Sequence, residues 1–286
     1  MITRASVELS LVVPVHHCAG DLGPTLHALA RFLDAAPVAT ELVLVDDRGS
    51  DPAAATQLRL LSRRPDVRLI ENARNEGKGY SVRRGMLAAV GRHRVFTDAD
   101  LAYPLHEVWK ISDALERGAD VAIACRALDE SRYEVASPYL PYFYTRHALS
   151  RTFNRLVRAT LLPGILDTQA GLKGFTAAAA RDVFSRVRIA GFGFDLECLY
   201  VARCLTLSVE QVAVLYRCDD EPSTVRFARD GRRMLADLAR IRWRAFTGQY
   251  LLASSTAHAD HADHAGPADY ADKEFTVARI GSPAST

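Results

Sequence analysis

The sequence has few cysteines, little net charge and no long apolar run, and each shortage excludes a class of protein. Its five cysteines are scattered and form no Cys-x-x-Cys pair, so we expect neither a disulfide framework nor a zinc site, and a reducing compartment. The formal net charge of +2 is too small to indicate a nucleic-acid partner. No run reaches the roughly 20 apolar residues that a membrane-spanning helix needs, and the first 15 residues lack the pattern of a signal peptide. We therefore expect a cytoplasmic protein without a membrane-spanning segment.

Two nucleotide-binding signatures are also missing. No Gly-x-Gly-x-x-Gly follows the first apolar run, which argues against a dinucleotide-binding dehydrogenase, and the glycine loop at 75–79 lacks the spacing of a P-loop. The apolar share of 49% and the charged share of 24% are nevertheless those of a soluble globular chain.

Short apolar runs alternate with longer helical patterns through the first half of the chain. Strands are predicted at 9–15, 41–45, 67–70, 94–97 and 119–124, and helices at 23–34, 53–63, 80–90 and 105–116. This alternation indicates an α/β fold with a mostly parallel central sheet. Ligands of such sheets bind at the carboxyl ends of the strands, so the polar clusters after the second, third and fourth strands should converge at one edge.

The second half has fewer regular patterns. We predict a basic amphipathic helix at 146–158, a loop at 164–175, a helix at 195–204, a last strand at 212–216 and a long basic helix at 224–243. After residue 250 the composition changes to an Ala/Asp/His-rich tail, which indicates disorder.

Two aspartates follow the strand predicted at 94–97. Asp98 and Asp100 are hard oxygen ligands, one residue apart, of the kind that binds Mg²⁺ or Mn²⁺ between phosphate oxygens. A metal held there would neutralise the charge that builds on a departing diphosphate. The alternative is a loop with two capping aspartates, because Asp-x-Asp also occurs often by chance.

Two further polar groups are expected at the same edge. Asp46 and Asp47 end the second strand, where a carboxylate can accept hydrogen bonds from a base or ribose or can cap the next helix. The loop at 75–79 supplies a flexible backbone and the cation of Lys78, which favours a phosphate or sugar contact.

Basic and acidic residues of the second half suggest an acceptor site. Arg146 and Ser150 lie on the polar face of the helix predicted at 146–158, and aromatic residues precede it, which suits a membrane interface or an apolar acceptor groove. A solvated surface helix is the alternative. Asp195 and Glu197 follow an aromatic and glycine-rich run, and either one is a candidate general base or a helix-start carboxylate.

Taken in order, these motifs resemble the family-2 glycosyltransferases, in particular the dolichyl- and polyprenyl-phosphate sugar synthases of the β-glucosyltransferase branch. The matching segments are Val12–Val15, Val45–Asp47 with Ser50, Asn75–Gly79, Asp98–Leu101, Asp167–Phe175, Phe194–Glu197 and Arg240–Arg244. The resemblance implies the GT-A fold, a Rossmann-like nucleotide-diphospho-sugar transferase architecture. It also implies a catalytic domain over 1–217, a basic helical extension over 218–250 and the tail over 251–286.

The resemblance further implies a role for individual residues. The nucleotide-sugar site would comprise Pro14, Val15, Asp46, Asp47, Lys78, Asp98, Ala99 and Gln169. Asp98 and Asp100 would hold Mg²⁺ or Mn²⁺, with Asp100 the more direct ligand. The acceptor phosphate would be bound by Arg126, Arg146 and Ser150. Asp195 stands where relatives place a base, although a phosphate acceptor needs positioning more than deprotonation.

The activity that this resemblance implies is inverting transfer of a hexose, glucose from UDP-glucose, to a polyprenyl phosphate, with the protein in the cytoplasm or peripheral at the inner face of the membrane. Two departures from the family pattern stand out: His16-His17 replaces Asn-Glu, and Ala102 stands where some relatives have a third metal contact. The lack of membrane helices keeps a soluble acceptor, such as a nucleoside or other metabolite, as an alternative. A nucleotidyltransferase and a non-catalytic sugar-nucleotide sensor are further alternatives.

Overall fold

The computed structural model describes residues 7–16, 22–48, 52–135, 153–218, 227–252 and 277–278. Its main sheet has eight strands in the order β10-β8-β5-β7-β4-β1-β2-β3. These strands are β1 Leu9–Val15, β2 Thr40–Asp46, β3 Val67–Glu71, β4 His93–Phe96, β5 Val121–Ala124, β7 Lys173–Thr176, β8 Val209–Val212 and β10 Val277–Ala278. All neighbouring pairs are parallel except the two that β7 makes with β4 and β5. The prediction of an α/β fold with a mostly parallel sheet is confirmed.

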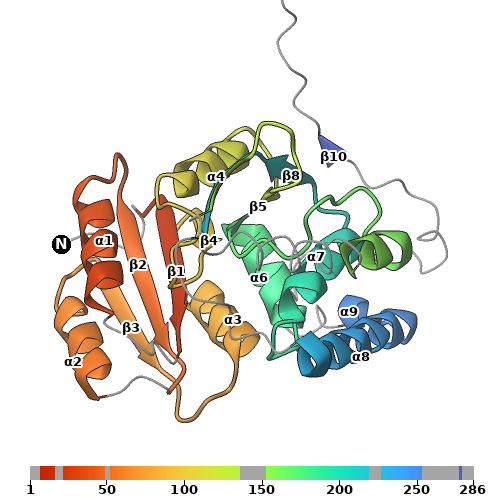
Figure 1. Cartoon of the computed structure of the whole chain (residues 1–286), viewed down its shortest axis with the longest axis horizontal. Helices are drawn as coiled ribbons and strands as arrows, with labels where there is room; N and C mark the ends of the chain where they lie inside the picture. Colours follow the sequence, from red (N-terminus) through yellow and green to blue (C-terminus); the bar gives the residue numbers. More distant parts are fainter. Residues whose placement is uncertain are drawn as a thin grey trace, which may run out of the picture.

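Helices cover both faces of this sheet (Figure 1). On one face lie α1 Gly23–Asp34, α2 Pro52–Leu61 and α4 Glu107–Glu116, and on the other α3 Lys78–Ala88, α6 Ala177–Arg186 and α7 Phe194–Cys204. The alternation of side chains along each strand builds the two cores. In β1, Leu11 and Val13 pack on the α1 side, whereas Val12 packs on the α3 side.

The α3 helix lies very close to the sheet. A Cβ on Gly85 would stand 2.4 Å from Cγ1 of Val12, so only glycine permits this distance between helix and strand. Because α3 begins at Lys78, this packing fixes the place of the lysine relative to the ends of β1 and β4.

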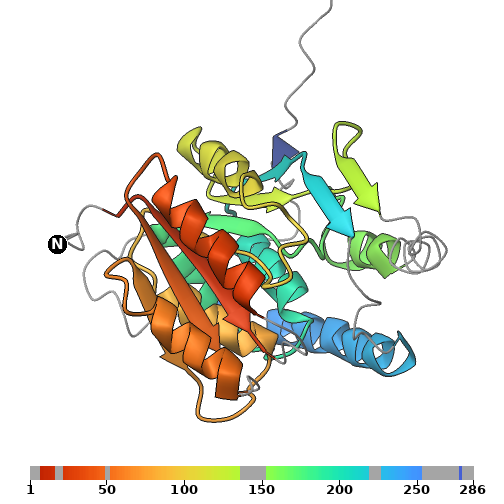
Figure 2. The same cartoon turned by 60° about the vertical axis from the view of Figure 1, so that its left-hand side comes forward.

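The C-terminal elements pack beyond α7. They are α8 Phe227–Phe246 and the short α9 Gln249–Leu252. In Figure 2, α8 (blue) runs beneath the green helix over residues 153–160. A second, two-stranded parallel sheet is formed by β6 Arg132–Val135 and β9 Leu215–Cys218.

Three sequence predictions are corrected here. The loop predicted at 164–175 ends in β7, which enters the centre of the sheet antiparallel to both neighbours. The single strand predicted at 212–216 is two strands, β8 and β9, which belong to different sheets. Within the tail, residues 277–278 form β10 beside β8, and most of the remaining tail lies outside the described residues.

No helix in the described ranges is both long enough and apolar enough to cross a bilayer.

Candidate active site

The carboxyl ends of β1 and β2 lie side by side, because the two strands pair in register. Pro14 is paired with Val45 and Val15 with Asp46, and the amide of Asp47 donates to the carbonyl of Val15 at 2.9 Å. The four residues predicted to line a nucleotide pocket, Pro14, Val15, Asp46 and Asp47, are therefore brought together by the sheet.

The buried carboxylate of Asp47 holds the glycine loop at 75–77. Its Oδ1 accepts from the side-chain amide of Asn72 at 2.7 Å and from the backbone N–H of Glu76 at 2.9 Å, while Oδ2 accepts from the N–H of Gly77 at 2.8 Å. Both oxygens are thus engaged by the loop. In the structure, Asp47 joins the end of β2 to the start of α3.

A second contact holds the start of α3 from the opposite side. The carbonyl of Ala190 accepts from the backbone N–H groups of Gly79 and Tyr80, at 2.7 and 3.3 Å. Gly77 has φ +97°, and a Cβ there would lie 2.6 Å from the same carbonyl oxygen. The Asn75–Gly79 motif needs its glycines for this close backbone contact.

Lys78 is placed by this arrangement against the first aspartate of the Asp-x-Asp motif. Its Nζ lies 2.7 Å from Oδ1 of Asp98. Burial lowers the pKa of Lys78, but the carboxylates of Asp98, Asp195 and Asp100 outweigh burial and hold the pKa well above its ordinary value. The expected convergence of polar groups at one sheet edge is confirmed by these contacts, and it creates a lysine surrounded by three acids.

The two aspartates differ in their surroundings. Asp98 is half-buried and lies against Gly171, where a Cβ would stand 2.3 Å from its Oδ2. Asp100 is exposed, and its Oδ1 accepts from the N–H of Ala102 at 3.1 Å. Between them, the carbonyl of Ala99 accepts from the hydroxyl of Thr25 at 3.2 Å.

The donor set fits a divalent ion that is shared with a phosphorylated ligand. In the part of the chain that the structure describes, no three His, Cys, Asp or Glu side chains group closely enough to hold a metal by themselves. Mg²⁺ is commonly bound by one or two carboxylates with substrate phosphates and waters completing its shell, and Asp98 and Asp100 supply two. The ammonium of Lys78 already shows that a cation is stable beside Asp98.

Asp195, the candidate base, is paired with a buried lysine. Its Oδ1 lies 2.6 Å from Nζ of Lys173, a side chain that is 0% exposed. The same Nζ also donates to the carbonyl of Ala170. Lys173 was part of the Asp167–Phe175 motif but received no role from the sequence, because a lysine between Gly171 and Gly174 gave no sign of being buried.

Glu197, the second candidate base of that segment, has a structural role. It is completely buried, and its Oε2 accepts from the backbone N–H groups of Arg188 and Ile189 at 2.7 and 2.6 Å. Its Oε1 accepts from Arg244 at 2.7 Å and from the hydroxyl of Tyr250 at 2.8 Å. With four donors on one buried carboxylate, Glu197 is not placed to take a proton from an acceptor.

Arg126, predicted to bind an acceptor phosphate, is paired with Asp167. Nε and Nη2 of the arginine donate to the two carboxylate oxygens at 2.7 and 3.0 Å. Burial raises the pKa of Asp167, but Arg126 outweighs it and holds the pKa below its ordinary value. Arg146 and Ser150, the other two predicted phosphate ligands, lie outside the described residues.

Helix α8 borders the site. The sequence predicted residues 218–250 only as a basic helical extension and did not indicate this contact. The side-chain amide of Gln169 lies 3.9 Å from Sδ of Met234. A Cβ on Gly193, next to the start of α7, would stand 2.4 Å from a carboxylate oxygen of Asp237. The repeated arginines of α8 predict a basic helix, but they do not reveal which side of the helix packs against the protein.

Comparison with known proteins gives a family match and a set of relatives. A family model described as glycosyl transferase family 2 matches residues 10–184. A dolichyl-phosphate beta-glucosyltransferase of Drosophila melanogaster is 33% identical over 223 residues, covering 73% of this chain and 67% of the relative. Its counterpart in Dictyostelium discoideum is 28% identical over 258 residues, covering 87% and 78%.

Solved structures show the same architecture at lower identity. Glucosyl-3-phosphoglycerate synthase from Mycobacterium tuberculosis, in complex with phosphoglyceric acid, has a TM-score of 0.62 at 16% identity, over 83% of this chain and 81% of that chain. The same synthase with Mn²⁺, UDP-glucose and phosphoglyceric acid has a TM-score of 0.60 at 16% identity, over 83% and 80%.

Proposed function

The chain belongs to glycosyl transferase family 2 and has the GT-A fold, and on that basis we propose that it transfers glucose from UDP-glucose to the phosphate of a polyprenyl carrier, with inversion at the anomeric carbon. The observation that carries this proposal is the cluster of Lys78, Asp98 and Asp100 at the carboxyl end of β4. The names of the relatives supply the acceptor class, since several are dolichyl-phosphate glucosyltransferases.

In the proposed reaction, an oxygen of the acceptor phosphate attacks the anomeric carbon. The bond between that carbon and the diphosphate breaks, and UDP leaves with the electron pair. Asp98 and Asp100 would hold Mg²⁺ or Mn²⁺, which stabilises the charge of the leaving diphosphate. Lys78 provides a further positive charge at the same place. Electrostatic stabilisation of this kind supplies much of the barrier reduction in such transfers.

Positioning is the second contribution of the protein. The acceptor phosphate is already anionic near neutral pH, so the proposed attack needs alignment more than a strong base. The ion pair of Asp195 with Lys173 supports a positioning role for that carboxylate. Arg126 donates to Asp167 through Nε and Nη2, and we assign its Nη1 edge, with Arg146 and Ser150, to the acceptor phosphate.

The proposal places the protein in the cytoplasm, peripheral at the inner face of the membrane that contains the carrier. It is tested by incubating the whole chain with Mn²⁺, UDP-glucose and a short-chain polyprenyl phosphate. Equal amounts of UDP and glucosyl-phospho-polyprenol are expected, with GDP-glucose as the comparison donor. UDP release only with a nucleoside or another soluble acceptor would instead support the alternative acceptor class. Release of pyrophosphate from a separate mixture of UTP, glucose 1-phosphate and Mn²⁺, with no transfer from UDP-glucose, would instead support a nucleotidyltransferase.

A thermal-shift series tests the donor independently of the acceptor. A ligand that binds only the folded state raises the melting temperature by mass action. We expect UDP-glucose with Mn²⁺ to raise it more than either one alone, because the two carboxylates need the diphosphate to complete a metal shell.

A further inference from the structure

Large apolar side chains lie exposed along one side of α8. Leu235, Trp243 and Phe246 are 50%, 64% and 86% exposed in the part of the chain that the structure describes. The rings of Trp243 and Phe246 lie together, with their centroids 6.4 Å apart. Such side chains are usually withdrawn from water, and a contiguous exposed group of them marks an interaction surface.

The helical period arranges these residues as a stripe. At 3.6 residues per turn, Leu235, Ala239, Trp243 and Phe246 fall on one side of the helix, and we call these four residues the α8 stripe. The opposite side of α8 is buried against the protein at positions 237 and 241. The stripe therefore faces away from the core.

Arginines flank the α8 stripe on both sides. From the same helical geometry, Arg242 lies along one edge, and Arg233 and Arg240 lie along the other. All three are exposed. Arg240 pairs with Asp237, and Arg242 donates to the carbonyl of Thr160 at 3.1 Å.

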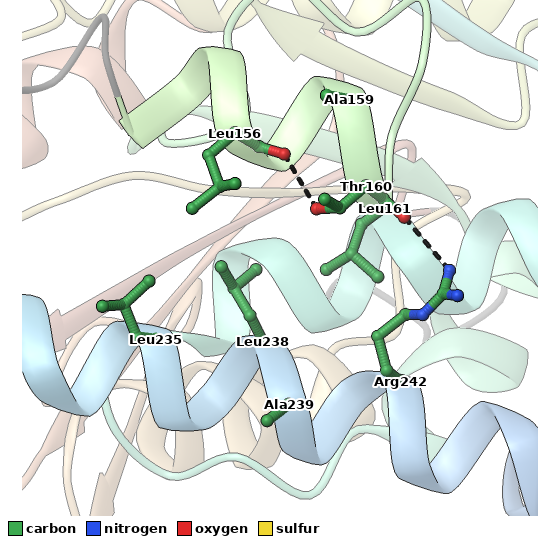
Figure 3. A pocket seen from close by; sticks show the side chains of 8 residues that line it. All are labelled: Leu156, Ala159, Thr160, Leu161, Leu235, Leu238, Ala239 and Arg242. Atoms are coloured by element: carbon green, nitrogen blue, oxygen red, sulfur yellow. Dashed lines mark hydrogen bonds between the residues drawn. The ribbon is translucent and has the colours of Figure 1, made fainter.

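An apolar groove continues the stripe toward the helix over residues 153–160. It has a volume of about 530 Å³, and Figure 3 shows Leu235 and Leu238 of α8 facing Leu156 and Leu161 across it. Leu156 is itself 42% exposed. The groove thus adds apolar surface from a second helix to that of the α8 stripe.

We propose that the α8 stripe and this groove dock on the surface of a lipid bilayer that contains anionic headgroups. An apolar face with tryptophan, bordered by arginines, is the arrangement that lies in the interface plane of a bilayer. The arginines attract anionic lipids while the aromatic side chains enter the region between headgroups and acyl chains. A second copy of this chain fits less well, because packing stripe against stripe would bring the flanking arginines of the two copies together.

Docking in this way would bring the candidate site to the membrane. Met234 precedes Leu235 of the stripe and contacts Gln169, which belongs to the candidate nucleotide-sugar site. The inference rests on the proposed function for its biological sense, since a polyprenyl phosphate acceptor is itself held in the bilayer. Its physical basis, the exposed stripe with its arginines, is independent of that function.

Flotation with lipid vesicles tests the proposal on the whole chain. The vesicles are phosphatidylcholine alone, or phosphatidylcholine with phosphatidylglycerol, and contain no polyprenyl phosphate. We expect the protein to float with the anionic vesicles at low salt and not with the neutral ones. The double variant Trp243→Ser/Phe246→Ser should lower the partition coefficient by about tenfold or more, because two exposed rings no longer enter the interface.

The matched control is Val38→Ser/Leu60→Ser, which removes two apolar side chains that are 42% and 60% exposed elsewhere on the surface. It should float like the unaltered protein. Failure of the unaltered protein to float, equal flotation of the stripe variant, or equal binding to neutral vesicles would overturn the proposal. So would a dimer in solution that the stripe variant abolishes, since the stripe would then be covered by a second copy. Because these vesicles contain no acceptor, flotation is measured independently of catalysis. A protein that floats but transfers no glucose in the separate assay with polyprenyl phosphate would contradict the proposed function and leave docking intact.

Discussion

Arg244 of α8 donates from Nη1 to Oε1 of Glu197 at 2.7 Å, and this buried contact joins the C-terminal helices to the candidate site. The other oxygen of Glu197 holds the backbone at Arg188 and Ile189. The next residue, Ala190, provides the carbonyl on which α3 begins. One carboxylate therefore connects α8 to the segment that places Lys78 beside Asp98.

The first prediction concerns this connection. Replacing Arg244 by alanine should lower the free energy of unfolding by roughly 3 kcal/mol, because it leaves a fully buried carboxylate without its cationic partner. Urea denaturation measures the change. Adding Glu197→Gln to the Arg244→Ala variant removes the uncompensated charge, so the double variant should recover part of the loss.

Arg59→Ala is the control at an exposed ion pair. The side chains of Arg59 and Glu71 are 63% and 48% exposed in their pair, and exposed pairs contribute at most about 1 kcal/mol. Equal losses for Arg244→Ala and Arg59→Ala would show that the contact with buried Glu197 has no special weight in stability.

The second prediction concerns the space beside the first aspartate of the Asp-x-Asp motif. A Cβ on Gly171 would stand 2.3 Å from Oδ2 of Asp98, so Gly171→Ala must displace that carboxylate. A displacement of about 1 Å can lower the rate of a positioned reaction by about 10²-fold, and we expect a loss of that order in kcat/KM. The melting temperature should change little, because the half-buried Asp98 side chain can move.

Gly191→Ala is the control for adding a methyl group near the site. A Cβ at position 191 would meet nothing within 4 Å, so activity should be retained. Full activity of Gly171→Ala would mean that the position of Asp98 does not matter to the reaction.

Strands β1 and β2 could be predicted because they are buried along their whole length and contain runs of apolar residues. The predicted strand 9–15 has the same bounds as β1. By contrast, β7 contains Gly174 and the buried Lys173, neither of them typical of a strand. Gly174 is needed because a Cβ there would stand 2.4 Å from Ile111 of α4. That requirement depends on a helix 63 positions away in the chain and leaves no local pattern.

Part of the candidate site could also be predicted from the sequence. The meeting of Lys78 with Asp98 follows from the rule that strand ends converge, and the structure confirms it. The role of Glu197 could not be foreseen, because its partners Arg244 and Tyr250 lie 47 and 53 positions away. A carboxylate near a helix start suggests a base or a helix contact equally well until those partners are known.

The third prediction concerns pH. Arg126 holds the pKa of Asp167 below its ordinary value in the folded protein, so the folded state binds a proton less readily there than the unfolded state. The pair therefore contributes stability above the unfolded pKa of about 3.9, and the contribution is lost as the pH falls through the lower folded value.

The measurement compares the unaltered protein with Asp167→Asn by urea denaturation at several pH values. We expect a difference in unfolding free energy of roughly 3 kcal/mol at neutral pH, constant down to about pH 5 and shrinking below about pH 4. A difference that grows as the pH falls would contradict the lowered pKa of Asp167.

The last prediction separates the second aspartate of the motif from the stability of the fold. Asp100 is exposed, and its side chain accepts from the N–H of Ala102, so Asp100→Ala should change the free energy of unfolding by no more than about 0.5 kcal/mol. Removing a group that stabilises the leaving diphosphate should lower glucosyl transfer by about 10²–10³-fold. Asp113→Ala, at an exposed position of α4, is the control and should keep its activity.

The Mn²⁺-dependent rise of the melting temperature with UDP-glucose should also disappear in Asp100→Ala. If that rise persists and transfer at saturating Mn²⁺ matches the unaltered protein, Asp100 does not hold the metal, and the charge of the diphosphate must be balanced by Lys78 instead.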